Sequence, residues 1–134
     1  MINKEDANIL IVDDIEDNRY TLERRLKRDG YKNIFSAEGG KVALDMASKN
    51  RFDLILLDLM MPDMSGLEVL KHLKGDPLQR TIPVIMVTAS DEVETAAECI
   101  INGADDFITK PFNGTLLKAR VGASLEKKRL RDSE

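Results

Sequence analysis

Short apolar runs alternate with amphipathic stretches along the whole chain. Three of the runs, Ile9–Val12, Leu54–Leu57 and Val84–Val87, contain only aliphatic side chains or methionine. Runs of this length and composition are typical of parallel strands that are buried on both faces. The strands that the pattern predicts cover residues 8–13, 33–37, 53–58, 82–88 and 105–109.

Apolar residues at helical spacing separate these strands. In one such segment, Leu67, Leu70 and Leu73 are expected to face the core. Asn113 is suited to cap the last helix, because its side-chain oxygen can accept a backbone N–H of the first turn. The helices that the pattern predicts cover residues 15–29, 39–49, 66–74, 91–102 and 113–131.

Five alternations of strand and helix predict an α/β fold. Its simplest form is a doubly wound, five-stranded parallel sheet with helices on both faces. A length of 134 residues fits one domain, and 43% hydrophobic with 33% charged residues is typical of a globular chain. No apolar stretch approaches the length of a membrane span, and the N-terminus has no signal-peptide pattern. We therefore expect a cytoplasmic protein with no membrane contact.

Charge and cysteine content exclude several classes of site. A net charge of −4 argues against direct nucleic-acid binding. The single cysteine, Cys99, excludes an internal disulfide and a CxxC metal site, and its helical context places it in the core. The only histidine, His72, cannot form a histidine cluster and is expected on a solvated helix face.

Polar residues follow the three aliphatic runs directly. They are Asp13-Asp14, Asp58 and Thr88. The carboxyl ends of parallel strands meet at one edge of the sheet, where open α/β sheets bind ligands. Carboxylates about 4 Å apart repel by roughly 4 kcal/mol at an effective dielectric near 20, so such a cluster needs a cation. Oxygen ligands without His or Cys favour Mg²⁺, although two acids after a strand can also simply cap the next helix.

A lysine follows the last predicted strand. Lys110 can balance the acids or hold a phosphoryl oxygen, and the hydroxyl of Thr88 can donate to the same group. A metal, a lysine, a hydroxyl and a lone carboxylate together form a phosphoryl-transfer site, with Asp58 as the candidate nucleophile. A lysine alone, without the other groups, is better explained as a solvated surface residue.

With these residues in this order, the chain resembles the receiver domain of two-component response regulators, which has a flavodoxin-like fold. The resemblance covers about residues 7–125 and keeps the order and spacing of the family. The segments that carry it are Val12-Asp13-Asp14, Asp58-Leu59-Met60-Met61-Pro62-Asp63-Met64-Ser65-Gly66, Val87-Thr88-Ala89 and Lys110-Pro111-Phe112.

The resemblance implies a phosphoacceptor and a metal site. Asp58 matches the aspartate that takes a phosphoryl group from a phosphohistidine on a histidine kinase or a histidine phosphotransfer protein. Asp13, Asp14 and Asp58 match the Mg²⁺ ligands, together with the backbone carbonyl of Met60. Such a domain is a regulatory phosphoacceptor that catalyses only its own phosphorylation and dephosphorylation.

The resemblance also implies a switch. Thr88 and Lys110 match the residues that contact the phosphoryl group, and Phe107 matches an aromatic whose rotamer follows activation. Residues 91–125 are then expected to change and control an output. The Lys110–Pro111 bond matches a peptide bond that is usually cis in the family.

Two further expectations concern partners. Asp105, Asp106 and Arg120 match positions that form ion pairs between subunits in one branch of the family, which suggests a homodimer through the 91–125 face. The helical pattern continues past a receiver domain of residues 1–125. Residues 126–134 are therefore an extension of the last helix, either as a charged end or as a link to an output domain after Glu134.

Two other classes of function compete with the switch. A phosphatase with an aspartate nucleophile normally carries Asp-x-Asp, whereas Asp58 is followed by Leu59 and Met60. A binding module, either a pseudo-receiver or a flavodoxin-like carrier, is expected to lack an acid or the lysine, or to carry a phosphate-binding loop after the first strand. The sequence keeps the acids and Lys110 and places Asp13 and Asp14 where that loop would be.

Overall fold

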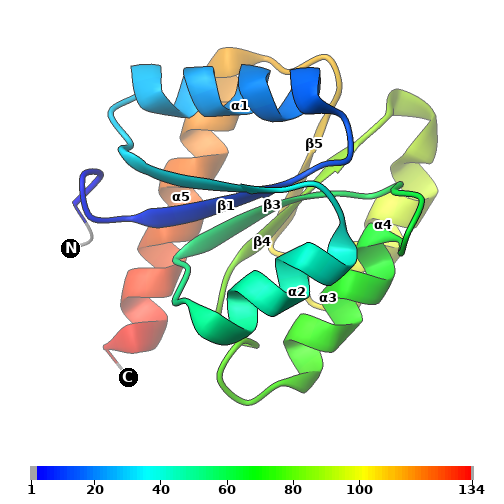
Figure 1. The fold of residues 1–134 in the computed structure, drawn as a ribbon. Helices are drawn as coiled ribbons and strands as arrows, with labels where there is room; N and C mark the ends of the chain where they lie inside the picture. The colour runs from blue at the N-terminus through cyan, green and yellow to red at the C-terminus, as the bar shows by residue number, and fades with distance from the viewer. Residues whose placement is uncertain (1–2, 134) are drawn as a thin grey trace.

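A five-stranded parallel sheet forms the centre of the computed structural model, which describes residues 3–133 (Figure 1). The strand order is β2-β1-β3-β4-β5, and every neighbouring pair is parallel. The strands are β1 (Asn8–Val12), β2 (Asn33–Ala37), β3 (Leu54–Asp58), β4 (Val84–Thr88) and β5 (Asp106–Thr109).

Helices cover both faces of this sheet. The side chains of α1 and α5 pack in one apolar cluster, and those of α2, α3 and α4 pack in the other. The helices are α1 (Glu16–Arg28), α2 (Gly40–Lys49), α3 (Gly66–Gly75), α4 (Val93–Ile101) and α5 (Gly114–Asp132), with a 3-10 turn η1 (Ser90–Glu92) before α4. The predicted doubly wound α/β fold is confirmed.

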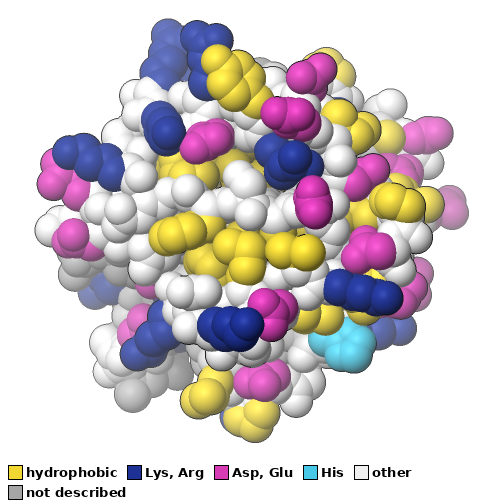
Figure 2. Space-filling view, viewed as in Figure 1, with side chains coloured by type: hydrophobic (Ala, Val, Ile, Leu, Met, Phe, Trp, Pro, Cys, Tyr) yellow, Lys and Arg dark blue, Asp and Glu magenta, His cyan; other side chains and the backbone are white. Residues whose placement is uncertain are grey.

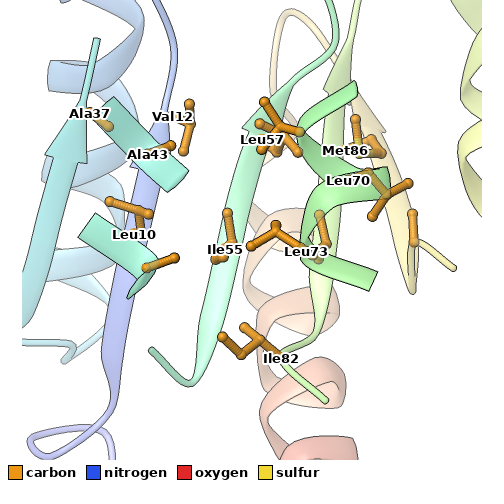
Figure 3. Packing of buried hydrophobic residues seen from close by; sticks show 14 of the residues in the cluster. Leu10, Val12, Ala37, Ala43, Ile55, Leu57, Leu70, Leu73, Ile82 and Met86 are labelled. Atoms are coloured by element: carbon orange, nitrogen blue, oxygen red, sulfur yellow. The ribbon is translucent and has the colours of Figure 1, made fainter. Parts of the chain in front are cut away.

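The central strands β1, β3 and β4 are apolar along the four-residue runs Ile9–Val12, Leu54–Leu57 and Val84–Val87, because both of their faces are covered. On β1, Ile9 and Ile11 belong to the cluster of α1 and α5, whereas Leu10 and Val12 belong to the other cluster (Figure 3). Strands β3 and β4 alternate in the same way. The aliphatic runs of the sequence therefore correspond to the most buried part of the domain.

The predicted element boundaries lie within two residues of those in the structure, and two local details differ. The helix expected over 91–102 begins as η1, where the Glu92 carboxylate accepts the Ala89 N–H at 2.7 Å and tightens the turn before α4. In α3, Leu67 is only partly buried, and Val69 joins Leu70 in the core.

Several expectations about single residues are confirmed. Cys99 is buried in the core and His72 is exposed. Asn113 caps α5, accepting the Leu116 N–H at 3.0 Å. Among the helices of residues 3–133, none combines the length and the apolar character that crossing a membrane requires. On the face shown in Figure 2, basic and acidic side chains are interspersed around a band of hydrophobic ones.

Gly66 starts α3 directly against the backbone of β3. Its N–H donates to the carbonyl of Leu59 at 2.7 Å. A Cβ at this position would lie 2.3 Å from the backbone oxygen of Asp58 and 2.9 Å from the Cα of Leu59. The end of β3 can therefore approach α3 only because residue 66 has no side chain.

Gly66→Ala is therefore expected to destabilise the domain by about 1–3 kcal/mol, the usual cost of overpacking. Urea unfolding measures this cost. Gly75→Ala, at the other end of α3, is the matched control, because a Cβ there meets nothing within 4 Å. The control should be neutral or slightly stabilising, since alanine favours helix over glycine. Equal stabilities of the two variants would show that the contact with Asp58 has no effect.

Candidate functional site

Four chemically active residues converge where the strands end. Asp13 directly follows β1, Asp58 and Thr88 are the last residues of β3 and β4, and Lys110 directly follows β5. Because β1, β3, β4 and β5 are consecutive neighbours in a parallel sheet, their ends form one edge. The structure therefore brings together the residues that the sequence singled out.

The acids form a compact cluster at this edge. Carboxylate oxygens of Asp13, Asp14 and Asp58 all lie within 4.8 Å of one another. Asp13 and Asp58 are 1% and 4% exposed, whereas Asp14 is exposed to solvent. Asp13 is fixed in place because its Oδ1 accepts the Ile15 N–H at 2.9 Å and its backbone carbonyl accepts from Arg19 at 2.7 Å.

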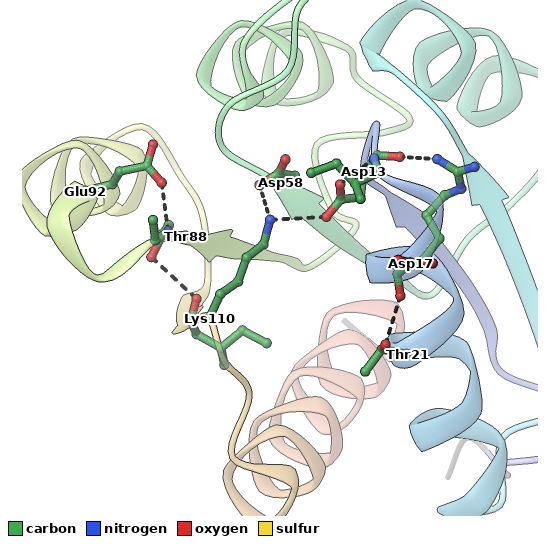
Figure 4. Close-up of polar contacts among 11 residues, drawn as sticks. Asp13, Asp17, Thr21, Asp58, Thr88, Glu92 and Lys110 are labelled. Carbon is green, nitrogen blue, oxygen red and sulfur yellow. Dashed lines mark hydrogen bonds and ion pairs between the residues drawn. The ribbon is translucent and has the colours of Figure 1, made fainter.

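Lys110 bridges the two buried acids. Its Nζ lies 3.2 Å from Asp58 Oδ1 and 3.3 Å from Asp13 Oδ2 (Figure 4). The bond between Lys110 and Pro111 is cis, as the resemblance implied. The ammonium is the one cation in contact with both acids among residues 3–133.

The charges of the site do not balance. Burial and the neighbouring Asp13 carboxylate raise the pKa of Asp58 to about 6, although the Lys110 ammonium works to lower it. Burial works to lower the pKa of Lys110, but the Asp58 and Asp13 carboxylates outweigh it and raise that pKa above its ordinary value. One lysine is thus insufficient for the acids, and the cluster favours an additional positive charge.

The donor set fits a magnesium ion. Asp13 Oδ2 is buried and, apart from its ion-pair contact with Lys110, accepts no hydrogen bond within the described residues. The site offers carboxylate oxygens and no nitrogen or sulfur ligand, which is the preference of a hard divalent cation. Asp13, Asp14 and Asp58 are therefore the residues that could hold Mg²⁺. Met60 follows in the loop after β3 with its side chain 61% exposed, and the role of its carbonyl stays a prediction.

The two predicted switch residues lie on β4 and β5, the strands that follow β3 in the sheet. Thr88 is fully buried, and its hydroxyl donates to the carbonyl of Ile108 at 3.4 Å, a long hydrogen bond. Phe107 is partly buried and packs against the core on the α2, α3 and α4 side. The guanidinium of Arg120 lies 5.9 Å from the centre of its ring.

The residues of the predicted dimer face make ion pairs within the chain. Arg120 contacts Asp106 at 2.5 Å and also donates to the carbonyl of Phe107. Asp105 contacts Arg131 at 2.7 Å. A role of these residues between subunits stays a prediction.

Sequence reasoning missed three residues that support the site and its surroundings. Arg19 holds the Asp13 carbonyl, Glu92 binds the backbone after Thr88, and Arg131 reaches back to Asp105. Charged residues on solvent-facing helix positions carry no distinguishing signal in a single sequence. Arg19 alone has a favourable position, in the first turns of the helix that follows the acid pair.

Comparison with known proteins connects this geometry to a family. The model of the response regulator receiver domain matches residues 9–122. Response regulator PleD of Caulobacter vibrioides is 45% identical over 115 residues, which are 86% of this chain and 25% of that protein. Chemotaxis protein CheY-3 of Vibrio cholerae is 34% identical over 127 residues, covering 95% of this chain and 97% of that protein. The chain thus spans about a quarter of PleD and almost all of CheY-3.

Solved structures agree with these relatives. The receiver domain of Francisella response regulator 1452 superposes with a TM-score of 0.81 at 30% identity, covering 90% of this chain and 98% of that one. Since the family model spans most of its length, and relatives above 30% identity match it almost end to end, the chain belongs to the response regulator receiver domains of two-component signalling, which are phosphoacceptor regulatory modules.

Proposed function

We propose that this domain is a signalling switch in which Asp58 accepts a phosphoryl group from a phosphohistidine on a histidine kinase or a histidine phosphotransfer protein. The observation that carries the proposal is the Lys110 bridge, which places an ammonium against a buried, partly desolvated carboxylate at an open sheet edge. In the transfer, an Asp58 oxygen bonds to phosphorus as the P–N bond breaks. The leaving imidazole nitrogen keeps the electron pair of the P–N bond and takes a proton from solvent.

Each neighbouring residue has a separate part in this transfer. Lys110 holds a phosphoryl oxygen, and the Thr88 hydroxyl donates to another. Asp13, Asp14 and Asp58, with the Met60 carbonyl, hold Mg²⁺. When bound, the ion supplies positive charge that offsets the repulsion between the acids and the phosphoryl oxygens.

Phosphorylation changes the partner of Thr88. The hydroxyl now makes a 3.4 Å bond to the Ile108 carbonyl, and an acyl phosphate offers a charged acceptor instead. A hydrogen bond to a charged group is worth about 1.5–3 kcal/mol, which shifts a two-state equilibrium roughly tenfold to hundredfold. Phe107 then turns into the space that Thr88 leaves, and the surface formed by residues 91–125 changes.

We further propose that this surface reaches an output in a larger assembly. An output domain joined after Glu134, a residue outside the described range, is one form that this assembly could take. A homodimer through the 91–125 face is the second expected contact, with Asp105, Asp106 and Arg120 at its charged positions. The cytoplasmic location inferred from the sequence stays a prediction.

Incubation with acetyl phosphate and Mg²⁺ tests the proposed function. Intact mass should increase by one phosphoryl group, and peptide mapping should place that group on the peptide that contains Asp58. Addition of EDTA before acetyl phosphate should prevent the adduct. A metal-independent adduct, or one on another peptide, would contradict the proposal. Turnover of unrelated phosphomonoesters would favour the aspartate-nucleophile phosphatase, and no adduct would favour the pseudo-receiver.

A further inference from the structure

Helix α5 continues well beyond the part of the chain that matches the family model. The match ends at residue 122, and α5 ends at Asp132. Three side chains after the match are nevertheless buried: Ser124, Leu125 and Lys128. We call residues 126–133 the α5 end. A helix end that merely projects into solvent would not bury the amine-bearing side chain of a lysine.

Arg131 ties the α5 end to the sheet at two points. One guanidinium nitrogen lies 2.7 Å from Asp105 Oδ2, and the other donates to the Thr81 carbonyl at 3.0 Å. The Asp105 side chain is 3% exposed, and its second oxygen accepts the Val84 N–H at 3.1 Å. Asp105 thus joins the start of β4 to the α5 end, and it directly precedes β5.

Lys128 adds a second attachment. Its amine contacts Asp132 at 2.5 Å within the helix and lies 4.0 Å from Asp53, which precedes β3. Asp53 in turn accepts the Asn8 N–H of β1 at 2.8 Å. Directly or through Asp53 and Asp105, the α5 end is therefore attached near the first residues of four of the five strands, β1, β3, β4 and β5.

Strand β5 connects these attachments to the phosphoacceptor site. Lys110 follows β5 at the site, and Asp105 precedes it at the opposite edge of the sheet. Between them, Arg120 of α5 holds the side chain of Asp106. Arg120 and Arg131 are about three helical turns apart, so they lie on the same side of α5. Two arginines of α5 therefore form ion pairs with two adjacent acids, Asp105 and Asp106, at the start of β5.

We propose that the α5 end is a docked part of the switch, held by the Arg131–Asp105 pair and loosened when β5 shifts in response to phosphorylation of Asp58. This inference rests on the proposed function for its trigger, but the docking itself does not depend on it. Lys110 already contacts Asp58, so a phosphoryl group added there displaces Lys110 and β5, and with them Asp105 relative to Arg131. The position of the α5 end then reports the state of the site.

Hydrogen exchange of the full chain, read by mass spectrometry, tests the docking. Arg131→Ala should speed exchange in residues 128–133 by at least about tenfold, because a charge-assisted contact to a buried acid is lost. Arg129→Ala is the matched control, since Arg129 has the same helical propensity and, among residues 3–133, forms its ion pair with the exposed Glu126 alone. Arg131→Lys keeps the charge but has a single amine in place of two guanidinium nitrogens. Its exchange rate in residues 128–133 should lie between those of the wild type and Arg131→Ala. Equal exchange in the Arg131→Ala and Arg129→Ala proteins would overturn the docking.

The trigger is tested on the wild-type protein with Mg²⁺ and acetyl phosphate. Exchange in residues 128–133 should increase in the same sample in which intact mass shows the phosphoryl adduct. An adduct without a change in exchange would overturn the coupling and leave the proposed function intact. Absence of the adduct would overturn the proposed function and the coupling together, and the docking would still be decided by the Arg131 and Arg129 variants.

Discussion

Asp58→Asn is expected to abolish the phosphoryl adduct and to make the metal-free domain more stable above pH 6. The loss of the adduct follows because an amide cannot act as the nucleophile. The gain in stability follows because Asp58 is buried beside Asp13. Ionisation of Asp58 in the folded state is unfavourable, since the charge loses its hydration and is repelled by the Asp13 carboxylate. The asparagine has the shape of the protonated acid without the charge.

The pH dependence of this gain has a defined sign. The folded-state pKa of Asp58 is about 6 against an ordinary value of 3.8, so the folded domain binds the proton more tightly than the unfolded chain. The wild type therefore has its full stability below about pH 4 and loses stability as pH rises towards 6. At about 1.4 kcal/mol for each pKa unit, the asparagine variant should be more stable by about 3 kcal/mol at pH 7 and equal at pH 4.

Urea unfolding in EDTA at several pH values measures the difference between Asp58→Asn and the wild type. Asp17→Asn, an exposed acid in the first turn of α1, is the control and should show no comparable pH-dependent gain. Mg²⁺ should narrow the difference, because it binds the folded wild type more tightly than the variant. A variant that is less stable than the wild type at pH 7 would show that the acids do not repel as the geometry indicates.

Lys110→Ala is expected to have the opposite effect. Removal of the ammonium leaves Asp13 and Asp58 ionised and buried without their shared cation, and breaking a buried ion pair in this way usually costs about 3–5 kcal/mol. Protonation of Asp58 relieves part of this cost, since its pKa rises further once Lys110 is gone. The loss of stability should therefore be greatest above pH 7 and smaller near pH 5.

Thermal or urea unfolding of Lys110→Ala and the wild type without metal, at pH 8 and pH 5, measures this loss of stability. Lys49→Ala is the control, because Lys49 pairs with Asp45 at 3.1 Å while both side chains are more than half exposed. An exposed pair of this kind contributes less than about 1 kcal/mol at either pH. If Lys110→Ala cost no more than Lys49→Ala, the bridge would have no role in stability and its place in the mechanism would be in doubt.

Much of the fold could be predicted because its strongest signals are local. The aliphatic runs that became β1, β3 and β4 are uninterrupted, and such runs have few other uses in a chain of this composition. Strand β5 has a weaker apolar pattern, but it could still be predicted because it lies between two predicted helices. The turn before α4 was not predicted, since it depends on the Glu92 carboxylate meeting one backbone N–H. A single hydrogen bond of this kind leaves no periodic pattern in the sequence from which it could be predicted.

The site could be predicted for a related reason. Residues at the carboxyl ends of parallel strands must meet, so Asp13, Asp58, Thr88 and Lys110 were brought together by topology rather than by spacing. The bridging geometry of Lys110 could not be predicted. Nor could the return of Arg131 to Asp105, because long side chains on a helix surface have many partners within reach.

The pairing of Arg120 with Asp106 inside one chain has a consequence for self-association. A second copy that recruited the same arginine would replace an existing contact rather than add one. The charges would then fix how two molecules are oriented, while the binding strength would have to come from newly covered apolar surface. On this side of the molecule Ile101 of α4 is 86% exposed, with Val93 and Ile100 also accessible. The affinity between two copies should accordingly depend on the exposed apolar residues of α4, and the specificity of their association on the charged Arg120 of α5.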